Sequence, residues 1–284
     1  MDIILVNNGL GNQMSQYALY LSKKARGQRV RRFFRDTAHN GIELDTVFGV
    51  STRMSRIDML LQSLYLNRWP RINRVLRKLE MLDKIIEIDH SFQPRVLAAS
   101  SGIRFLIGGW HHPSYFGVIE STIRETYKFP AIVDESNLMV QRGAHEGNAV
   151  AIHIRRGDYM QGADYELYGS VCTECYYMNA IRYMEHKIRE NLIFYVFSND
   201  MQWSREFMAE KECVFVEWNR GVDSWKDMYL MSQFRYLIIP NSTFSWWAAY
   251  LGQEEKIVCR PPFFVNHEHC PGFYPEIWVE IDNK

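Results

Sequence analysis

The sequence of 284 residues lacks several features that mark particular classes of protein. No apolar run approaches the roughly 20 residues that a membrane-spanning helix needs. Residues 1–6 have no basic region ahead of their short apolar run, so we expect no secretory signal. Neither sign of charge predominates, because 33 lysines and arginines balance 33 acids. A disordered chain or a general polyanion-binding protein does not fit, and we expect a cytoplasmic protein with no nucleic-acid partner.

Cysteine is also scarce, with five residues in the chain. An odd number in a chain of this length argues against a scaffold built on disulfides. Cys172 and Cys175 have the spacing of metal ligands. A zinc site would take its remaining ligands from far along the chain, at His267, His269 and Cys270. One such pair without a second is a weak signal, so we favour free thiols.

The first half opens with a β-loop-α-β pattern. An apolar strand at residues 3–6 leads through a glycine-bearing loop into a helical pattern over 13–26, and a strand follows at 29–34. Such units build parallel sheets with ligand sites at the carboxyl ends of the strands. Met14 stands where a G-x-G-x-x-G fingerprint needs its third glycine, which excludes a nicotinamide-binding fold. A further strand is expected at 104–107.

Residues 52–84 are locally basic, with eight lysines and arginines against three acids. Apolar residues recur there near helical spacing, at Ile72, Val75, Leu76, Leu79 and Leu82. The pattern predicts a basic amphipathic helix. It fits an ordinary surface helix, and it also fits peripheral contact with the anionic leaflet of an inner membrane.

A polar, glycine-bearing stretch at 141–148 predicts a boundary between domains 1–145 and 146–284. Strand and helix patterns alternate after it. Strands are expected at 149–154, 192–197, 214–216, 236–239 and 256–259, and helices at 174–189, 201–210, 227–233 and 243–251. The alternation predicts a second doubly wound α/β domain.

Three polar groups follow strands in this second half, where open α/β sheets place their ligands. They are residues 153–159 (HIRRGDY), 198–200 (SND) and 241–247 (NSTFSWW). Arg155 and Arg156 end a buried strand, and their planar donors match the oxygens of a pyrophosphate. Asn241 or Ser242 can cap the next helix, whose N-terminus stabilises phosphate or ribose oxygens.

Each group also has a purely structural interpretation. An ion pair from Arg155 or Arg156 to Asp158 would explain the first group, and plain capping of a buried helix would explain the third. Recurrence at three successive strand ends favours a ligand site.

The segment His153–Tyr159 resembles the H-x-R-R-G-D-Y motif of α-1,2-fucosyltransferases, the glycosyltransferase family 11, which has bacterial members of about this length. Other blocks are similar to that family's signatures in the same order, at 9–18, 197–203, 227–232 and 241–247. The resemblance spans nearly the whole chain. Ser15, the segment 109–112 and Cys175 depart from the family pattern, which leaves the donor assignment intact and the acceptor open.

The resemblance implies an α/β fold of the GT-B type, with two facing Rossmann-like domains. Residues 1–145 would face the acceptor, and 146–284 would bind GDP-fucose. The implied reaction is inverting transfer of L-fucose from GDP-β-L-fucose to the 2-hydroxyl of a terminal galactose in a glycan. Synthesis of surface polysaccharide or lipopolysaccharide, including O-antigen, would be its setting.

The resemblance also implies a set of donor-binding residues. His153 and Asn199 would contact the guanine, residues 242–244 the phosphates or ribose, and Asn12 the fucose or acceptor. The full set is Gly11, Asn12, His153, Arg155, Arg156, Ser198, Asn199, Asn241, Ser242, Thr243 and Phe244.

Chemistry assigns two catalytic candidates. Arg155 is expected to stabilise the charge that grows on the β-phosphate as the glycosidic bond breaks, with Arg156 packing or assisting. Asp158 is the first candidate for a general base, although holding an arginine is an equal alternative for it. The other possibilities for deprotonation are Asp164, Glu166 and a water-assisted mechanism. The chain contains no D-x-D motif, so we expect no metal and no cofactor.

Two other functions stay open. One is a glycosyltransferase of the same fold with another nucleotide sugar or another acceptor hydroxyl. The other is a non-catalytic carbohydrate-binding protein, since tryptophans stack on sugars. Most tryptophans here fall in segments that indicate core, and a lectin has no need for paired arginines at a strand end.

Overall fold

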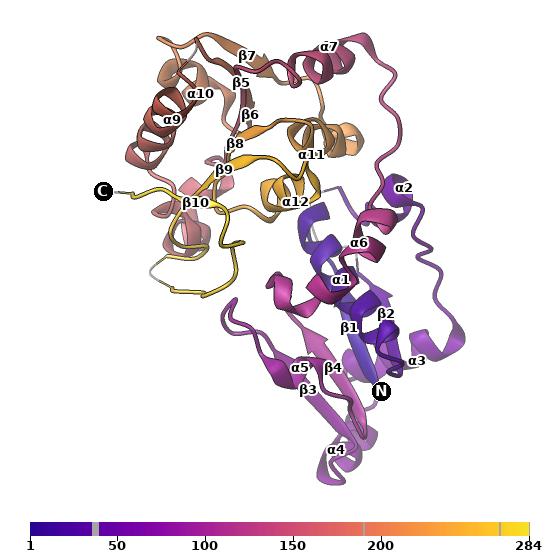
Figure 1. Cartoon of the computed structure of the whole chain (residues 1–284). Coiled ribbons are helices and arrows are strands. Elements are labelled where there is room, and N and C mark those ends of the chain that lie inside the picture. Colours follow the sequence, from indigo (N-terminus) through magenta and orange to yellow (C-terminus); the bar gives the residue numbers. More distant parts are fainter. Residues whose placement is uncertain (36–39, 190, 267, 284) are drawn as a thin grey trace. The chain divides into compact units, whose positions relative to one another are not determined.

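The computed structural model describes residues 1–35, 40–189, 191–266 and 268–283 and divides into two compact units, Met1–Phe129 and Pro130–Lys284 (Figure 1). Each unit is built on a parallel sheet with helices packed on it. The expected α/β class with two Rossmann-like units is therefore confirmed. That the two units face one another stays a prediction.

The first unit has a four-stranded parallel sheet in the order β2-β1-β4-β3. Its strands are β1 (Asp2–Val6), β2 (Val30–Phe34), β3 (Leu82–Ile86) and β4 (Ile103–Ile107). Every residue of β1 is buried, as expected for a central strand covered on both faces. The three predicted strands are confirmed, and β3 was missed.

Helix α1 (Leu10–Ala25) connects β1 to β2 and confirms the predicted first helix. The other helices of this unit are α2 (Leu44–Phe48), α3 (Arg56–Tyr65), α4 (Pro70–Lys78), α5 (Pro94–Leu97) and α6 (Glu120–Thr126), with 3₁₀ turns at Pro113–Tyr115 and Gly117–Ile119.

The predicted basic helix exists, but Leu82 does not belong to it. Helix α4 ends at Lys78, and Glu80 adopts a left-handed backbone with φ of 54°. This conformation ends the helix and turns the chain, so Leu82 becomes the first residue of β3. The apolar spacing therefore spanned a helix and the beginning of a strand.

A buried ion cluster ties the first unit together. The carboxylate of Asp2 is 1% exposed and lies 2.7 Å from the ammonium of Lys23, whose side chain is fully buried. Arg104 donates to both oxygens of the same carboxylate, from Nε at 2.8 Å and from NH2 at 2.9 Å. Strand β1, helix α1 and strand β4 are thus joined through one carboxylate, which nothing in the local sequence pattern indicated.

The second unit has a six-stranded parallel sheet in the order β10-β9-β8-β5-β6-β7. Its strands are β5 (Ala149–Ile154), β6 (Ile193–Ser198), β7 (Cys213–Val216), β8 (Tyr236–Ile238), β9 (Ile257–Arg260) and β10 (Val279–Glu280). The five predicted strands are confirmed, and β10 was too short to predict.

The helices of the second unit connect and cover these strands (Figure 1). They are α7 (Glu135–Gly143), α8 (Gly162–Asp164), α9 (Glu174–Ile188), α10 (Met201–Phe207), α11 (Trp225–Ser232) and α12 (Thr243–Leu251), with short turns at Asp158–Met160, Tyr165–Gly169 and Gly221–Asp223. All four predicted helices are present.

The units divide after Phe129, earlier than the predicted boundary at 145/146. The reason is helix α7, which packs on the second unit. Gln141 donates to the Tyr229 hydroxyl at 2.8 Å, and a Cβ on Gly143 would lie 1.9 Å from the hydroxyl of Tyr195. The stretch that suggested a linker is the end of this helix and the turn into β5.

Within the described ranges, no helix combines the length and the apolar content that crossing a membrane requires.

Candidate functional site

The three polar groups lie at the carboxyl ends of three adjacent strands, β8, β5 and β6. From β5 the chain proceeds to β6 and β7 on one side and later to β8 on the other side. The strand order therefore reverses between β5 and β8, and open α/β sheets bind their ligands at such a reversal. The predicted convergence of the groups at one sheet edge is confirmed.

Arg155 leaves β5 at this edge and is oriented by its neighbours. Its NH2 lies 2.6 Å from Oδ2 of Asp158, and its guanidinium carbon lies 5.4 Å from the ring centre of Tyr159. Its Nε is buried and has no hydrogen-bond partner among the described residues. The guanidinium is thus held in place with donor capacity to spare.

Arg156 is held differently. Its guanidinium carbon lies 4.1 Å from the ring centre of Trp203, and its Nε lies 3.6 Å from Oδ2 of Asp200. Stacking on the indole fixes the plane of the group while leaving its edge available. This geometry fits the packing or assisting role expected for Arg156.

Asn199 joins the second group to the first. Strands β5 and β6 pair so that Ile154 lies opposite Ser198, which brings the two following loops together. The Asn199 Oδ1 accepts from the backbone N–H of Arg156 at 2.9 Å, and its Nδ2 donates to Oδ1 of Asp158 at 2.9 Å. A Cβ on Gly157 would lie 2.7 Å from this Nδ2, so the absence of a side chain at Gly157 permits the contact.

Ser198 has a local structural task. Its hydroxyl oxygen accepts from the backbone N–H of Asp200 at 2.9 Å and is 2.8 Å from the hydroxyl of Ser204. The residue thereby shapes the turn into α10. A direct contact of Ser198 with a donor stays a prediction.

His153 is a buried, uncharged imidazole at the end of β5. Burial lowers its pKa to about 3, and the positive charge of Arg155 contributes to the same shift. Its ring centre lies 6.0 Å from that of Phe244 in the third group. Its Nδ1 is buried without a hydrogen-bond partner among the described residues, so a ligand can use it.

Asn241 is fully buried and braces the third group. Its Nδ2 donates to the backbone carbonyls of Tyr168 at 3.2 Å and Phe264 at 3.0 Å. The backbone carbonyl of Asn241 accepts a hydrogen bond from the Tyr159 hydroxyl. Its Oδ1 has no hydrogen-bond partner among the described residues.

The expected side-chain cap of α12 is not formed. Ser242 is the N-cap residue, but its side chain makes no cap hydrogen bond, and the amide of Asn241 is used elsewhere. The expectation that either side chain caps this helix was wrong, because Asn241 braces the loop instead. The first turn of α12, with Thr243 and Phe244, therefore begins at the sheet edge without a cap from the side chain of Ser242.

Gly11 and Asn12 belong to the first turn of α1 in the first unit. The order of that sheet also reverses, between β1 and β4, and α1 follows β1 directly. Gly11 is buried and its carbonyl accepts from the Ser15 hydroxyl at 3.2 Å. Both residues follow a strand at a reversal of the sheet order, where open α/β sheets commonly bind ligands, and their contact with a donor stays a prediction.

The sequence interpretation missed Glu87, which follows β3. Its Oε2 accepts from the backbone N–H groups of Gly109 at 2.6 Å and Trp110 at 3.0 Å. Burial raises its pKa to about 7, although these two hydrogen bonds oppose the shift. Its Oε1 is buried without a hydrogen-bond partner among the described residues. The sequence signal that could have identified Glu87 is an acidic residue directly after a strand. It was not recognised because β3 itself was not predicted.

The zinc alternative gains no support from the cysteine pair. Cys172 is buried, and this burial raises the pKa of its thiol far above the usual value, whereas Cys175 is exposed on α9. His267 lies outside the described residues. Among those that the structure does describe, no group of three or more His, Cys, Asp or Glu side chains could hold a metal ion.

Comparison with known proteins agrees with the motif at β5. Residues 2–281 match the model of glycosyl transferase family 11. The chain is 32% identical to an α-1,2-colitosyltransferase of Escherichia coli, over 99% of this chain and all of that protein. It is 40% identical to the O-antigen biosynthesis glycosyltransferase WbnK of E. coli, over 47% of this chain and 45% of that protein.

A primate enzyme is also similar. The galactoside α-(1,2)-fucosyltransferase 1 of Ateles belzebuth is 28% identical over 60% of this chain and 50% of that protein. The family match covers almost every residue, including the three strand-end groups and the segment of Glu87. The chain therefore belongs to glycosyl transferase family 11.

Proposed function

We propose that this glycosyltransferase is an α-1,2-fucosyltransferase. It transfers L-fucose from GDP-β-L-fucose to the 2-hydroxyl of a terminal galactose in a glycan, with inversion at the anomeric carbon. The observation that carries the proposal is the guanidinium of Arg155, which is oriented by Asp158 at the reversal point of the sheet and retains a buried donor without a partner among the described residues. The name of the relative WbnK favours a role in O-antigen, and so in surface glycan synthesis.

The proposed reaction leaves a negative charge on the departing GDP, which the guanidinium of Arg155 can stabilise. The acceptor oxygen forms a bond to the anomeric carbon while the bond from that carbon to the β-phosphate oxygen breaks. The acceptor proton passes to a base, and GDP leaves with one more negative charge. A fixed guanidinium beside the leaving phosphate stabilises this charge more in the transition state than in the ground state.

The guanine and ribose are assigned to the groups around Arg155. Among the described residues, Nδ1 of His153 and Oδ1 of Asn241 have no partner and offer polar contacts from inside the sheet edge. The N-terminus of α12, which the side chain of Ser242 does not cap, is the proposed donor of backbone N–H groups to phosphate or ribose oxygens. GDP-fucose and a galactoside are thus the proposed substrates, with Thr243 and Phe244 in contact with the donor.

A second donor is favoured by one observation, the full-length similarity to a colitosyltransferase. Colitose is fucose without its 3-hydroxyl, so the two donors differ by one hydroxyl group. A site that hydrogen-bonds this hydroxyl rejects the deoxy sugar by about 10⁴-fold, whereas an apolar site rejects the hydroxyl by only about 100-fold. The ratio of rates therefore identifies the natural donor.

The experiment measures GDP release and linkage with GDP-fucose, GDP-colitose and GDP-mannose, each with a galactoside acceptor. We expect the largest kcat/KM for GDP-fucose and an α-1,2 linkage by NMR. A larger value for GDP-colitose would move the assignment to that sugar. Tight binding of free oligosaccharide by a chain that ignores all three nucleotides would instead make this a carbohydrate-binding protein.

Transfer is proposed to need no divalent metal and no cofactor, because guanidinium groups take the place beside the leaving phosphate. Chelation with EDTA is expected to leave kcat within about twofold of the untreated enzyme, since removing a group that stabilises the leaving charge would lower the rate far more. The assay is GDP release before and after chelation. Loss of turnover that magnesium or manganese restores would contradict this expectation.

The base is tested with two matched amide variants, Asp158→Asn and Glu87→Gln. Both oxygens of Asp158 are engaged, by Arg155 and by Asn199, so the contacts favour a positioning role. We expect Asp158→Asn to raise the KM for the donor as well as to lower kcat, whereas loss of a base lowers chiefly kcat. Glu87 has an oxygen without a partner among the described residues and a pKa near 7, which suits a base.

Glu87→Gln is accordingly expected to lower kcat by roughly 100-fold with little change in donor KM. Asp164 and Glu166, the other two candidate bases, are exposed, and they are tested through Asp164→Asn and Glu166→Gln. A kcat effect confined to Asp158→Asn, with donor affinity unchanged, would assign the base to Asp158. Unchanged kcat in all four variants would favour water-assisted deprotonation.

A further inference from the structure

Helix α4 and its flanking residues expose apolar side chains that take no part in attaching the helix to the first unit. Along one face of α4, Ile72 is 51% exposed, Val75 55% and Leu79 61%. The residues that attach the helix to the unit are different ones. Asn73 donates to the carbonyl of Leu64 and to Oδ1 of Asn67, both at 2.8 Å, and Leu76 packs against the core.

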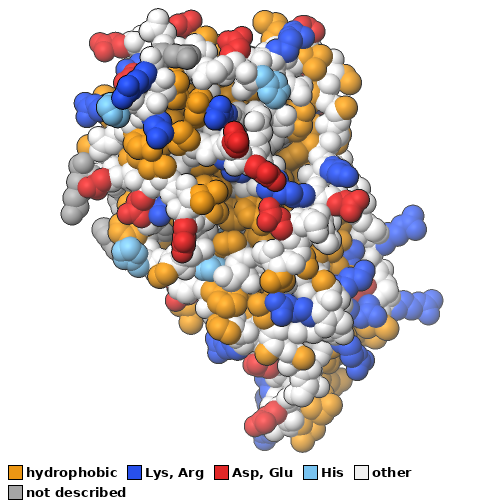
Figure 2. All heavy atoms as spheres, in the orientation of Figure 1, with side chains coloured by type: hydrophobic (Ala, Val, Ile, Leu, Met, Phe, Trp, Pro, Cys, Tyr) orange, Lys and Arg blue, Asp and Glu red, His pale blue; other side chains and the backbone are white. Residues whose placement is uncertain are grey.

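Further exposed apolar residues lie before and after these positions in the sequence. Leu66, Trp69 and Met81 are also exposed. Trp69 directly precedes α4, and tryptophan favours a position where one side is apolar and the other is wet. We call these six side chains the α4 apolar surface: Leu66, Trp69, Ile72, Val75, Leu79 and Met81. Figure 2 shows exposed apolar side chains in the part of the first unit where Figure 1 places α4, with lysines, arginines and an acidic side chain near them.

Positive charge outweighs negative charge around this surface. Residues 66–86 contain six cations and two acids. None of the six forms an ion pair with a described carboxylate: Arg68, Arg71, Arg74, Arg77, Lys78 and Lys84. Burial lowers the pKa of Lys84, and the positive charge of the nearby Arg77 contributes to the same shift.

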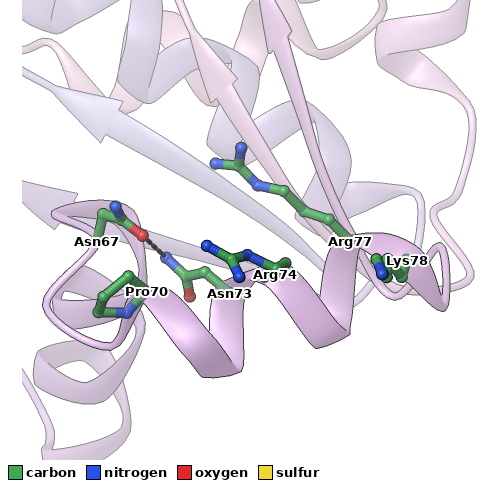
Figure 3. A pocket seen from close by; sticks show the side chains of 6 residues that line it. All are labelled: Asn67, Pro70, Asn73, Arg74, Arg77 and Lys78. Atoms are coloured by element: carbon green, nitrogen blue, oxygen red, sulfur yellow. Dashed lines mark hydrogen bonds between the residues drawn. The ribbon is translucent and has the colours of Figure 1, made fainter.

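Some of these cations line a hollow of about 340 Å³ beside the helix. Arg74 and Arg77 extend to the same side of α4, and Lys78 follows at the end of the helix (Figure 3). Asn67, Pro70 and Asn73 also line the hollow, and the side chain of Asn73 donates a hydrogen bond to that of Asn67. Three cations around one hollow suit a phosphate group.

The combination of exposed apolar side chains and nearby cations favours one class of partner. A nucleic acid would use the cations but leave the apolar face in water. A second copy of this chain would cover the apolar face but bring two sets of unpaired cations together across a symmetric interface. An anionic bilayer satisfies both features, because apolar side chains enter the boundary below the headgroups while cations contact lipid phosphates.

We propose that the α4 apolar surface and its six cations form an interfacial docking site for an anionic lipid membrane. Ile72, Val75 and Leu79 enter the acyl boundary, and the cations that flank them along the chain contact lipid phosphates. Docking by this surface needs no spanning helix. The proposal is independent of which sugar the enzyme transfers, since it rests on this surface alone.

The test is sedimentation of the full chain with vesicles of phosphatidylcholine, and with vesicles of phosphatidylcholine mixed with phosphatidylglycerol. We expect binding to the mixed vesicles only, weakened by added salt because screening reduces attraction by surface charge. Arg74→Gln with Arg77→Gln is expected to weaken the partition by roughly 10- to 30-fold. Ile72→Ser with Val75→Ser and Leu79→Ser is expected to weaken it by a similar or larger factor.

The matched control is Val118→Ser with Val133→Ser, two exposed apolar residues outside this surface, which should bind like the parent. All variants alter exposed side chains, so melting temperature and GDP release should stay at parental values and show that the fold is intact. Equal binding to both kinds of vesicle, or parental binding by both α4 variants, would overturn the proposal. Concentration-dependent dimerisation that the serine variant abolishes, without vesicle binding, would assign the surface to a second copy instead.

Discussion

Replacing Arg155 by alanine is expected to lower kcat by about 100- to 1000-fold, the usual cost of removing one fixed donor beside a developing charge. The side chain is held by Asp158 at 2.6 Å and lies against Tyr159, so its position is set before substrate binds. Arg155→Lys should recover little, because an ammonium cannot reproduce the planar fork of donors. The measurement is steady-state kinetics with the donor and a galactoside acceptor.

The control for Arg155 is Arg205→Ala. Arg205 forms an exposed pair with Glu217 in the same unit and lies over the ring of Phe215, so this variant should retain parental kcat. The melting temperature of Arg155→Ala should remain close to that of the parent, since its ion pair is partly exposed. A kcat within about threefold of the parent would contradict the assignment of Arg155 to the leaving phosphate.

Replacing Asp2 by alanine is expected to lower the free energy of unfolding of the first unit by about 3–5 kcal/mol. The variant leaves the ammonium of Lys23 and the guanidinium of Arg104 buried without their counter-charge. This loss is a large part of the stability of an ordinary domain, so much of the first unit should unfold at physiological temperature. Hydrogen exchange of the amides in β1 and β4 reports this unit separately from the second one.

The matched control is Glu120→Ala, which breaks the exposed pair with Arg124 in the same unit and should cost less than about 1 kcal/mol. A compensating variant sharpens the test. Replacing Asp2, Lys23 and Arg104 together by apolar residues of similar volume should restore much of the loss, because no charge then remains buried. An Asp2→Ala variant as stable as Glu120→Ala would show that the cluster does not hold the unit.

The elements of the second unit were predictable because each depends on local pattern. Alternation of short apolar runs with helical spacing located β5 and α12 at their observed bounds and the other strands within a residue or two. Strand β3 and strand β10 were not predicted. Strand β3 was missed because its first residue continues the helical spacing of the preceding apolar residues, although the left-handed backbone at Glu80 ends the helix before it. Strand β10 was missed because it has only two residues.

The candidate site was predictable to the extent that parallel strands place their carboxyl ends at one edge. That rule is enough to bring Arg155, Asn199 and Asn241 together from separate segments. It does not reveal which atoms are occupied. The bond from Asn199 to Asp158, and an Oδ1 of Asn241 without a partner among the described residues, appear only when the loops are folded against one another.

The amino-acid sequence by itself therefore determined the class of the fold, the family motif and the strand ends proposed to carry the chemistry, since all three depend on residues that are neighbours in the chain. Tertiary structure alone decided the partners of Asp2, the raised pKa of Glu87 and the outward direction of the apolar face of α4. Each of these depends on residues far apart in the chain. Burial and pairing are properties of the packed molecule, which no local period encodes.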